Sequence, residues 1–93
     1  MEVKIKRYTV IFRALANGNR LKIIAMLSRD KPGKMSVSQI ARALKISLKA
    51  TSNHLVILKN LDVLEDQGSQ GHVFYSVNFA MPEDFRKVIS VWI

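Results

Sequence analysis

The sequence predicts a mainly helical fold with one small β-hairpin, a winged helix-turn-helix in the order α-α-β-α-α-β-β-α. Three observations support this prediction. Apolar residues recur at helical spacing through the first two thirds of the chain. Two short predicted helices in that region are joined by three or four residues, and two short runs of strand-forming residues then flank a loop rich in glycine.

The size and composition of the chain indicate one compact domain covering residues 1–93. A chain of this length buries only about 60–65% of its unfolded surface, so a partner subunit would add to a modest core. The sequence contains no cysteine, which excludes disulfides and thiolate metal sites. No apolar run is long enough for a signal peptide or a membrane span, so we expect a cytoplasmic protein with no membrane partner.

The net charge of +8 is distributed unevenly along the chain. Residues 1–60 hold thirteen Lys and Arg against two acids, which gives +11, and residues 61–93 hold two against five, which gives −3. A basic region of this kind indicates a polyanionic partner, and double-stranded DNA is the leading candidate. A solubilising excess of charge would produce the same total, so charge alone does not decide between the two.

The first helix is expected over residues 3–16, where the spacing of the apolar residues forms one face. That face contains Ile5, Tyr8, Ile11, Phe12 and Leu15. Asn19 is predicted to cap the second helix by accepting its free amide hydrogens, and Leu21 and Ile24 begin the buried side of that helix. Residues 30–34 contain proline and glycine and are predicted to form a turn, followed by a stub of strand at residues 35–37.

The helix-turn-helix is expected over residues 38–61. Ser38 is predicted to cap a helix from Gln39 to Leu44, and Ser47 a longer helix from Leu48 to about Leu61. The buried stripe of the longer helix is expected to contain Thr51, Leu55, Leu58 and Leu61, although Thr51 could lie at its margin.

The second helix of such a motif enters the major groove with its first residues near the base edges. Exposed polar residues at its start are therefore the candidate DNA contacts. We expect Lys49, Ser52 and Asn53 near the bases, Ser47 at the start of the helix, and Arg42, Lys45 and Lys59 at phosphates.

The wing is expected over residues 63–77, as strands 63–67 and 72–77 on either side of a loop from Gly68 to Gly71. It carries Glu65 and Asp66 but no Lys or Arg. A wing of this charge would repel phosphate, which leaves more of the DNA contact to the helix.

The two terminal helices, residues 3–16 and 82–93, are more apolar than one small core requires. The last helix is expected to begin at Pro82, with Glu83 and Asp84 placed favourably against its dipole. Its apolar residues could fill the core of their own chain, but we favour a homodimer interface. That interface is predicted to contain Ile5, Tyr8, Phe12, Phe85, Ile89 and Trp92.

Three segments together resemble the ArsR-type (ArsR/SmtB) family of winged helix-turn-helix repressors. Residues 14–24 (ALANGNRLKII) are similar to the opening motif of that family, and residues 44–58 (LKISLKATSNHLVIL) to its recognition helix. Residues 71–77 (GHVFYSV) are similar to its second wing strand. The resemblance runs in unbroken register over roughly residues 10–78.

The resemblance implies a homodimeric repressor that binds double-stranded DNA and is released by an inducer, often a metal ion in this family. The thiolate cluster of the family lies near residues 36–42, where this chain has no cysteine. The alternative family site uses Asp and His pairs on the last helix, which here carries Glu83 and Asp84 but no histidine. We therefore expect no metal-sensing site and no cofactor, and the nature of any effector stays open.

The remaining candidate residues do not form a catalytic set. His54 could contact DNA or pack at the helix margin with a hydrogen bond, and its place beside the buried stripe favours packing. His72 is expected to be solvated or to lie near a phosphate. Without a convergent nucleophile and base we expect no enzyme. The alternative function is a protein-docking module without specific DNA binding; the acidic wing favours it, and the basic front region favours DNA.

Overall fold

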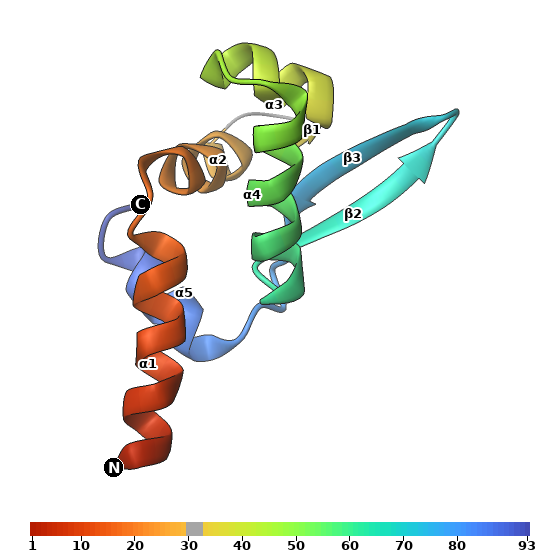
Figure 1. The fold of residues 1–93 in the computed structure, drawn as a ribbon. Coiled ribbons are helices and arrows are strands. Elements are labelled where there is room, and N and C mark those ends of the chain that lie inside the picture. The colour runs from red at the N-terminus through yellow and green to blue at the C-terminus, as the bar shows by residue number, and fades with distance from the viewer. Residues whose placement is uncertain (30–32) are drawn as a thin grey trace.

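The computed structural model of the chain describes residues 1–29 and 33–93. The elements follow the predicted order and confirm a winged helix-turn-helix (Figure 1). They are α1 (Glu2–Leu15), α2 (Gly18–Arg29), β1 (Lys34–Ser36), α3 (Val37–Leu44), α4 (Leu48–Asn60), β2 (Leu64–Ser69), β3 (His72–Val77) and α5 (Glu83–Ser90).

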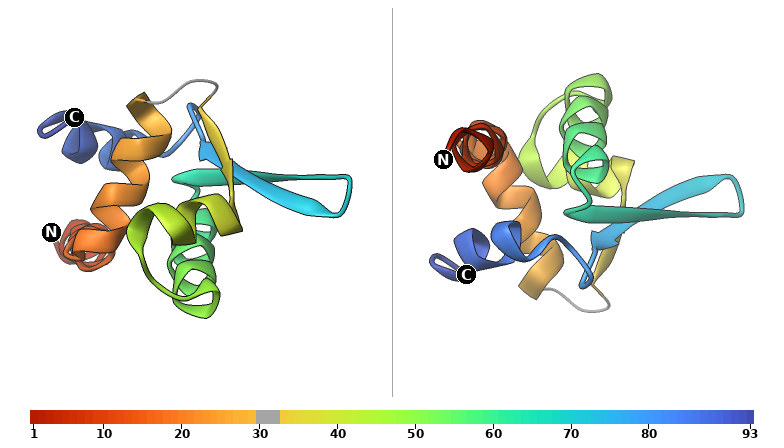
Figure 2. Two further views of the ribbon diagram at one scale, coloured as in Figure 1. Left: turned by 90° about the horizontal axis from the view of Figure 1, so that it is seen from above. Right: turned by 90° about the horizontal axis from the view of Figure 1, so that it is seen from below.

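The three strands form one antiparallel sheet in the order β1-β3-β2. β1 pairs with the last part of β3, with Met35 opposite Tyr75, whereas β2 pairs with β3 along its whole length. The outer part of the hairpin is therefore a two-stranded ribbon. Figure 2 shows this ribbon, the wing, projecting away from the helices, with β1 at its base.

The core lies where α2, α3 and α4 meet the base of the sheet, and it extends to α5. Its completely buried apolar side chains are Ile11, Ile23, Ile24, Ile40, Leu55, Leu58, Val63 and Phe85. Thr51 is also completely buried, and its hydroxyl donates to the Ser47 carbonyl oxygen at 2.8 Å. Every buried side-chain nitrogen and oxygen in residues 1–29 and 33–93 has a hydrogen-bond partner.

Two helix caps differ from the prediction. The cap of α3 is Ser36, not Ser38, because Ser36 forms a reciprocal capping box with Gln39. Its hydroxyl accepts from the Gln39 amide at 3.2 Å, and the Gln39 side chain accepts from the Ser36 amide at 2.8 Å. At α2 the capping side chain is that of Asn17, not Asn19, since Asn17 accepts from the Arg20 amide at 3.1 Å.

The hairpin turn is tighter than expected. Gly68 and Ser69 belong to β2, so the connection contains Gln70 and Gly71 alone. Both have positive φ, 51° and 80°, as a two-residue turn matched to the twist of the strands requires.

The expected turn at residues 30–34 falls mostly outside the described residues. Of this segment the structure describes Gly33, with φ of 82°, and Lys34, the first residue of β1. The last helix is shorter than the predicted 82–93: it ends at Ser90, and Trp92 lies in the turn that follows.

α1 extends well beyond the rest of the molecule, with α5 beside it (Figure 1). The overall dimensions, 45 × 24 × 22 Å, reflect this projection. Among the described residues no helix combines the length and the apolar character needed to cross a membrane.

Candidate nucleic-acid interface

The junction between α3 and α4 fixes the angle of the helix-turn-helix. Lys45 adopts the left-handed conformation, φ 58° and ψ 43°, and its amide donates to carbonyl oxygens in the last turn of α3. The Ile46 amide donates to the Ala41 carbonyl oxygen at 3.2 Å. A side chain in this conformation is costly, so the closed turn must be stabilised by these bonds and by the packing of the helices.

Ser47 caps α4 as predicted. Its hydroxyl oxygen accepts from the Ala50 amide at 3.0 Å, while its carbonyl accepts from the Thr51 amide and hydroxyl. Because the hydroxyl hydrogen is not used in the cap, it can still be donated to an approaching phosphate oxygen. The local role of Ser47 and a role in DNA contact are therefore compatible.

The exposed side of α4 carries the other candidate contacts. Lys49 and Asn53 are exposed and Ser52 is half-buried. Residues three and four apart share a helix face, so these three residues lie together on the side away from the buried Thr51 and Leu55.

The structure brings two predicted cations to this same end of α4. Arg42, in the last turn of α3, and Lys45, in the connection, are both exposed. Figure 1 shows α3 crossing close to the beginning of α4. A positive, polar surface therefore surrounds the start of the second helix of the motif.

Lys59 does not lie with this group. It is ten residues beyond Lys49, about 15 Å further along the helix axis. Its Nζ donates to Asp66 of β2 at 2.9 Å, and the hydrogen bond with this carboxylate raises the pKa of Lys59. Lys59, the predicted phosphate contact, is thus paired with a carboxylate of its own chain, seven residues further on, and helical periodicity does not reveal this contact because Asp66 lies on the following strand.

The wing is acidic where it meets α4. Glu65 and Asp66 are both exposed, and β2, β3 and their turn contain no Lys or Arg. The charge of the base of the wing is therefore opposite in sign to that of the surface at the start of α4.

His54 has the packed role that the sequence favoured. Its ring is half-buried, and Nδ1 lies 3.2 Å from Nη1 of Arg20. A guanidinium can only donate, so Nδ1 accepts. Burial, together with the charge of Arg20, lowers the pKa of His54.

Arg20 itself was not singled out from the sequence, although it stands in the motif of residues 14–24. Its Nε donates to the Ala14 carbonyl oxygen at 2.6 Å and its Nη2 to that of Arg13 at 3.4 Å. Arg20 therefore joins the end of α1 to the middle of α4 through His54.

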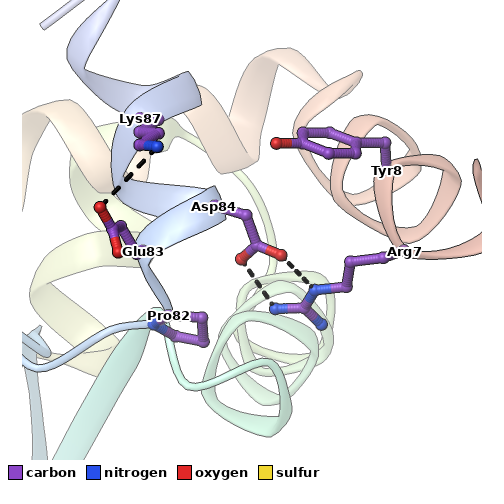
Figure 3. A pocket seen from close by; sticks show the side chains of 6 residues that line it. All are labelled: Arg7, Tyr8, Pro82, Glu83, Asp84 and Lys87. Atoms are coloured by element: carbon purple, nitrogen blue, oxygen red, sulfur yellow. Dashed lines mark hydrogen bonds and ion pairs between the residues drawn. The ribbon is translucent and has the colours of Figure 1, made fainter. Parts of the chain in front are cut away.

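A second set of contacts joins the terminal helices. Arg7 of α1 donates from Nε and Nη2 to the two carboxylate oxygens of Asp84 at 2.7 and 3.1 Å (Figure 3). The same guanidinium lies 5.3 Å from the centre of the Phe85 ring, a cation–π distance. The hydrogen bond from Arg7 is the main cause of the lowered pKa of Asp84.

This ion pair borders an open hollow of about 390 Å³ between α1 and α5. Figure 3 shows that its four charged side chains form two pairs, Arg7 with Asp84 and Lys87 with Glu83. The hollow therefore belongs to the contact region between α1 and α5. In the described part of the chain no three His, Cys, Asp or Glu side chains gather in a way that could hold a metal ion.

The structure corrects two residues of the predicted dimer interface. Phe85 is completely buried and Ile89 is 7% exposed within their own chain, so almost no surface of either remains for a partner to cover. They were misassigned because a short chain needs its last helix to close its own core. Ile5, Phe12 and Trp92 remain substantially exposed, and Tyr8 is half-buried against the core.

Comparison with known proteins agrees with this geometry. A family described as "Bacterial regulatory protein, arsR family" matches residues 17–66, from the end of α1 to the start of the wing. The transcriptional repressor SdpR of Bacillus subtilis (strain 168) is 34% identical over 74 residues, which are 80% of this chain and 79% of SdpR.

Solved structures show the same fold. Reduced HlyU from Vibrio cholerae N16961 superposes with a TM-score of 0.77 at 26% identity, over 98% of this chain and 90% of HlyU. A homodimeric winged helix-turn-helix DNA-binding domain from Mycobacterium bovis gives a TM-score of 0.75 at 24% identity, over 97% of this chain and 78% of that one.

The lowered pKa of His54 predicts that the free energy of unfolding decreases as the pH falls from about 7 to 5. As the pH falls, His54 becomes protonated in the unfolded chain near its ordinary pKa of 6.5, and in the folded chain only at lower pH. The contribution of neutral His54 to the free energy of unfolding is therefore complete above pH 6.5 and is lost as the pH falls below that value. Urea unfolding at a series of pH values measures the slope. His54→Gln should flatten it. An unchanged slope in His54→Gln would contradict this assignment.

The ion pair between Lys59 and Asp66 predicts that Asp66→Asn increases the affinity for duplex DNA. The substitution removes a negative charge and leaves Lys59 available to a phosphate, which should steepen the log–log salt dependence by up to about one. Glu65→Gln, which removes the same charge beside it, is the matched control and should have a smaller effect. Equal gains from the two variants would show that total charge matters and the pair does not.

Proposed function

This chain belongs to the ArsR family of bacterial regulatory proteins, and from that premise we propose that it is a homodimeric transcriptional repressor that binds specific operator DNA. The observation that carries the proposal is the positive, polar surface at the start of α4. Lys49, Ser52 and Asn53 are presented there by a helix whose opposite side is buried. Arg42 and Lys45 extend the same surface.

The residues of this surface have different roles in the proposed complex. Lys49, Ser52 and Asn53 contact base edges in the major groove, because they lie in the first two turns of the recognition helix. Arg42, Lys45 and the hydroxyl of Ser47 hold the flanking phosphates, which fixes the position of the helix without reading sequence. Lys59 contacts a phosphate only when its ion pair with Asp66 is broken.

The exposed apolar side chains near the chain ends support a homodimer. Ile5 and Phe12 of α1 are 51% and 54% exposed, and Trp92 is 37% exposed. Exposed apolar surface of this kind favours an interface, and a second copy of the chain would supply the same surface by symmetry. The Mycobacterium bovis neighbour, which has this fold, is itself a homodimer.

A two-fold dimer would present its two α4 helices to successive turns of the major groove, about 34–36 Å apart. The operator is then an inverted repeat that the repressor binds in the cytoplasm. The role as a repressor rests on the similarity to SdpR, whose name gives that activity.

Substitutions at the proposed surface should distinguish residues that contact the bases from residues that contact the phosphates. Asn53→Ala should reduce the preference for a selected duplex over a scrambled one, by about 1–3 kcal/mol for a good base contact. Lys45→Ala should weaken all duplexes alike and reduce the salt slope by about one. Asn60→Ala, an exposed asparagine at the far end of α4, is the control and should change neither.

Duplexes selected from a random library and titrated over a salt series provide the measurement. Absence of duplex binding even at about 50 mM salt would refute the proposed function and support a docking module.

The dimer predicts a second result. Phe12→Glu should convert the protein to a 10.6 kDa monomer and weaken operator binding, because it places a charge in an apolar interface while α4 is untouched. Phe12→Leu keeps the surface apolar and should remain dimeric. Sedimentation at micromolar concentration distinguishes the two. A native protein that is monomeric under these conditions and still binds operator tightly would exclude the dimer.

A further inference from the structure

Leu48 is a large apolar residue at the start of the recognition helix, where the surroundings are polar. It is the first residue of α4, and its side chain is 57% exposed. Its sequence neighbours, Ser47 and Lys49, are also exposed. Single exposed apolar residues are common on protein surfaces, but Leu48 stands in the part of α4 that the proposed function places against the bases.

The fold of the single chain does not require Leu48. The buried stripe of α4 is complete without it, since Leu55 and Leu58 are fully buried and Thr51 fills the next turn. Leu48 belongs neither to the core nor to the partly buried residues that pack against it. Leu48 begins α4, and Figure 1 shows the start of α4 beside α3 and away from α1.

The position of Leu48 relative to the proposed DNA contacts is specific. Leu48 stands three residues before the buried Thr51 and four before the half-buried Ser52, so it lies in the first turn of α4 at the margin between the buried side and the exposed polar side. The cations Lys45 and Lys49 stand on either side of it in the sequence. Phosphates held by these cations would bring the first turn of α4 to the floor of the major groove, where the residues at a helix start reach base edges.

Within the major groove an aliphatic side chain has one matching partner. The base edges there present hydrogen-bond donors and acceptors, and the one apolar group is the 5-methyl of thymine. We propose that Leu48 reads a thymine methyl in each half-site of the operator, beside the polar contacts of Ser52 and Asn53. This assignment rests on the proposed function and specifies one base of its target.

The test replaces thymine by deoxyuridine, which lacks only the 5-methyl group. A duplex selected from a random library with the native protein is synthesised with each thymine exchanged in turn. At one position per half-site the exchange should weaken binding about fourfold, the effect of one buried methyl group. Leu48→Ala should bind the thymine and deoxyuridine duplexes equally at that position.

Val56→Ala is the matched control. Val56 is also aliphatic and exposed on α4, at 47%, but it lies two turns further from the start of the helix. This variant should keep the full difference between thymine and deoxyuridine. The exposure of Leu48 makes misfolding of its variant a small concern, and the thermal unfolding midpoint provides the check.

Each alternative result has a distinct meaning. If the native protein prefers the selected duplex to a scrambled one but every deoxyuridine exchange is neutral, Leu48 does not read a methyl group, and the proposed function stands. If Val56→Ala abolishes the difference and Leu48→Ala keeps it, the reader is Val56 and the proposal is wrong. If no duplex is preferred over any other, the proposed function and the role of Leu48 fail together.

Discussion

The burial of one side of α4 is the constraint on which the rest of the structure depends. Leu55 and Leu58 are completely removed from solvent, and Thr51 joins them because its hydroxyl finds a partner in the Ser47 carbonyl. A hydroxyl buried without such a bond would cost free energy, so the burial of Thr51 depends on the position of the capping residue Ser47. With that side held in the core, the rotation of α4 about its axis is determined, and the polar residues of its first two turns must face outward.

The charged residues divide into those that hold the fold and those presented at the surface. Arg7 is committed to Asp84 and Phe85, and Arg20 to two carbonyl oxygens and His54. These contacts orient α1 against α5 and against α4. Arg42, Lys45 and Lys49 remain exposed around the start of α4. Part of the excess of positive charge is therefore presented at the recognition helix, whereas the base of the wing carries the acidic Glu65 and Asp66.

The small size of the chain explains how its last helix is used. A chain of 93 residues has few apolar side chains to close its core. α5 supplies Phe85 and Ile89 to that core, whereas Ile5, Phe12 and Trp92 are among the apolar side chains near the chain ends that stay exposed. In the proposed homodimer, α5 would contribute mainly by holding α1 in place through the ion pair between Arg7 and Asp84.

The sequence by itself determined the order of the elements, the Ser47 cap and three of the four residues expected in the buried stripe, because helical periodicity, strand composition and turn residues are local signals. The fourth, Leu61, caps the end of α4 and is half-buried. It also identified the exposed candidates on α4, which follow from the same periodicity once the buried side is known. Only the tertiary structure decided that Lys59 pairs with Asp66, that Arg20 reaches His54, and that Phe85 and Ile89 are internal. Those outcomes depend on which helices and strands meet in space, whether they are consecutive, as α4 and β2 are, or far apart in the sequence, as α2 and α4 are. The type of an apolar or charged residue does not by itself indicate which residue it will contact. The two corrected caps lie two residues before the predicted ones and have the same residue types. Ser36 replaces Ser38 because of its reciprocal hydrogen bonds with Gln39, and Asn17 replaces Asn19 because its side chain accepts from the Arg20 amide.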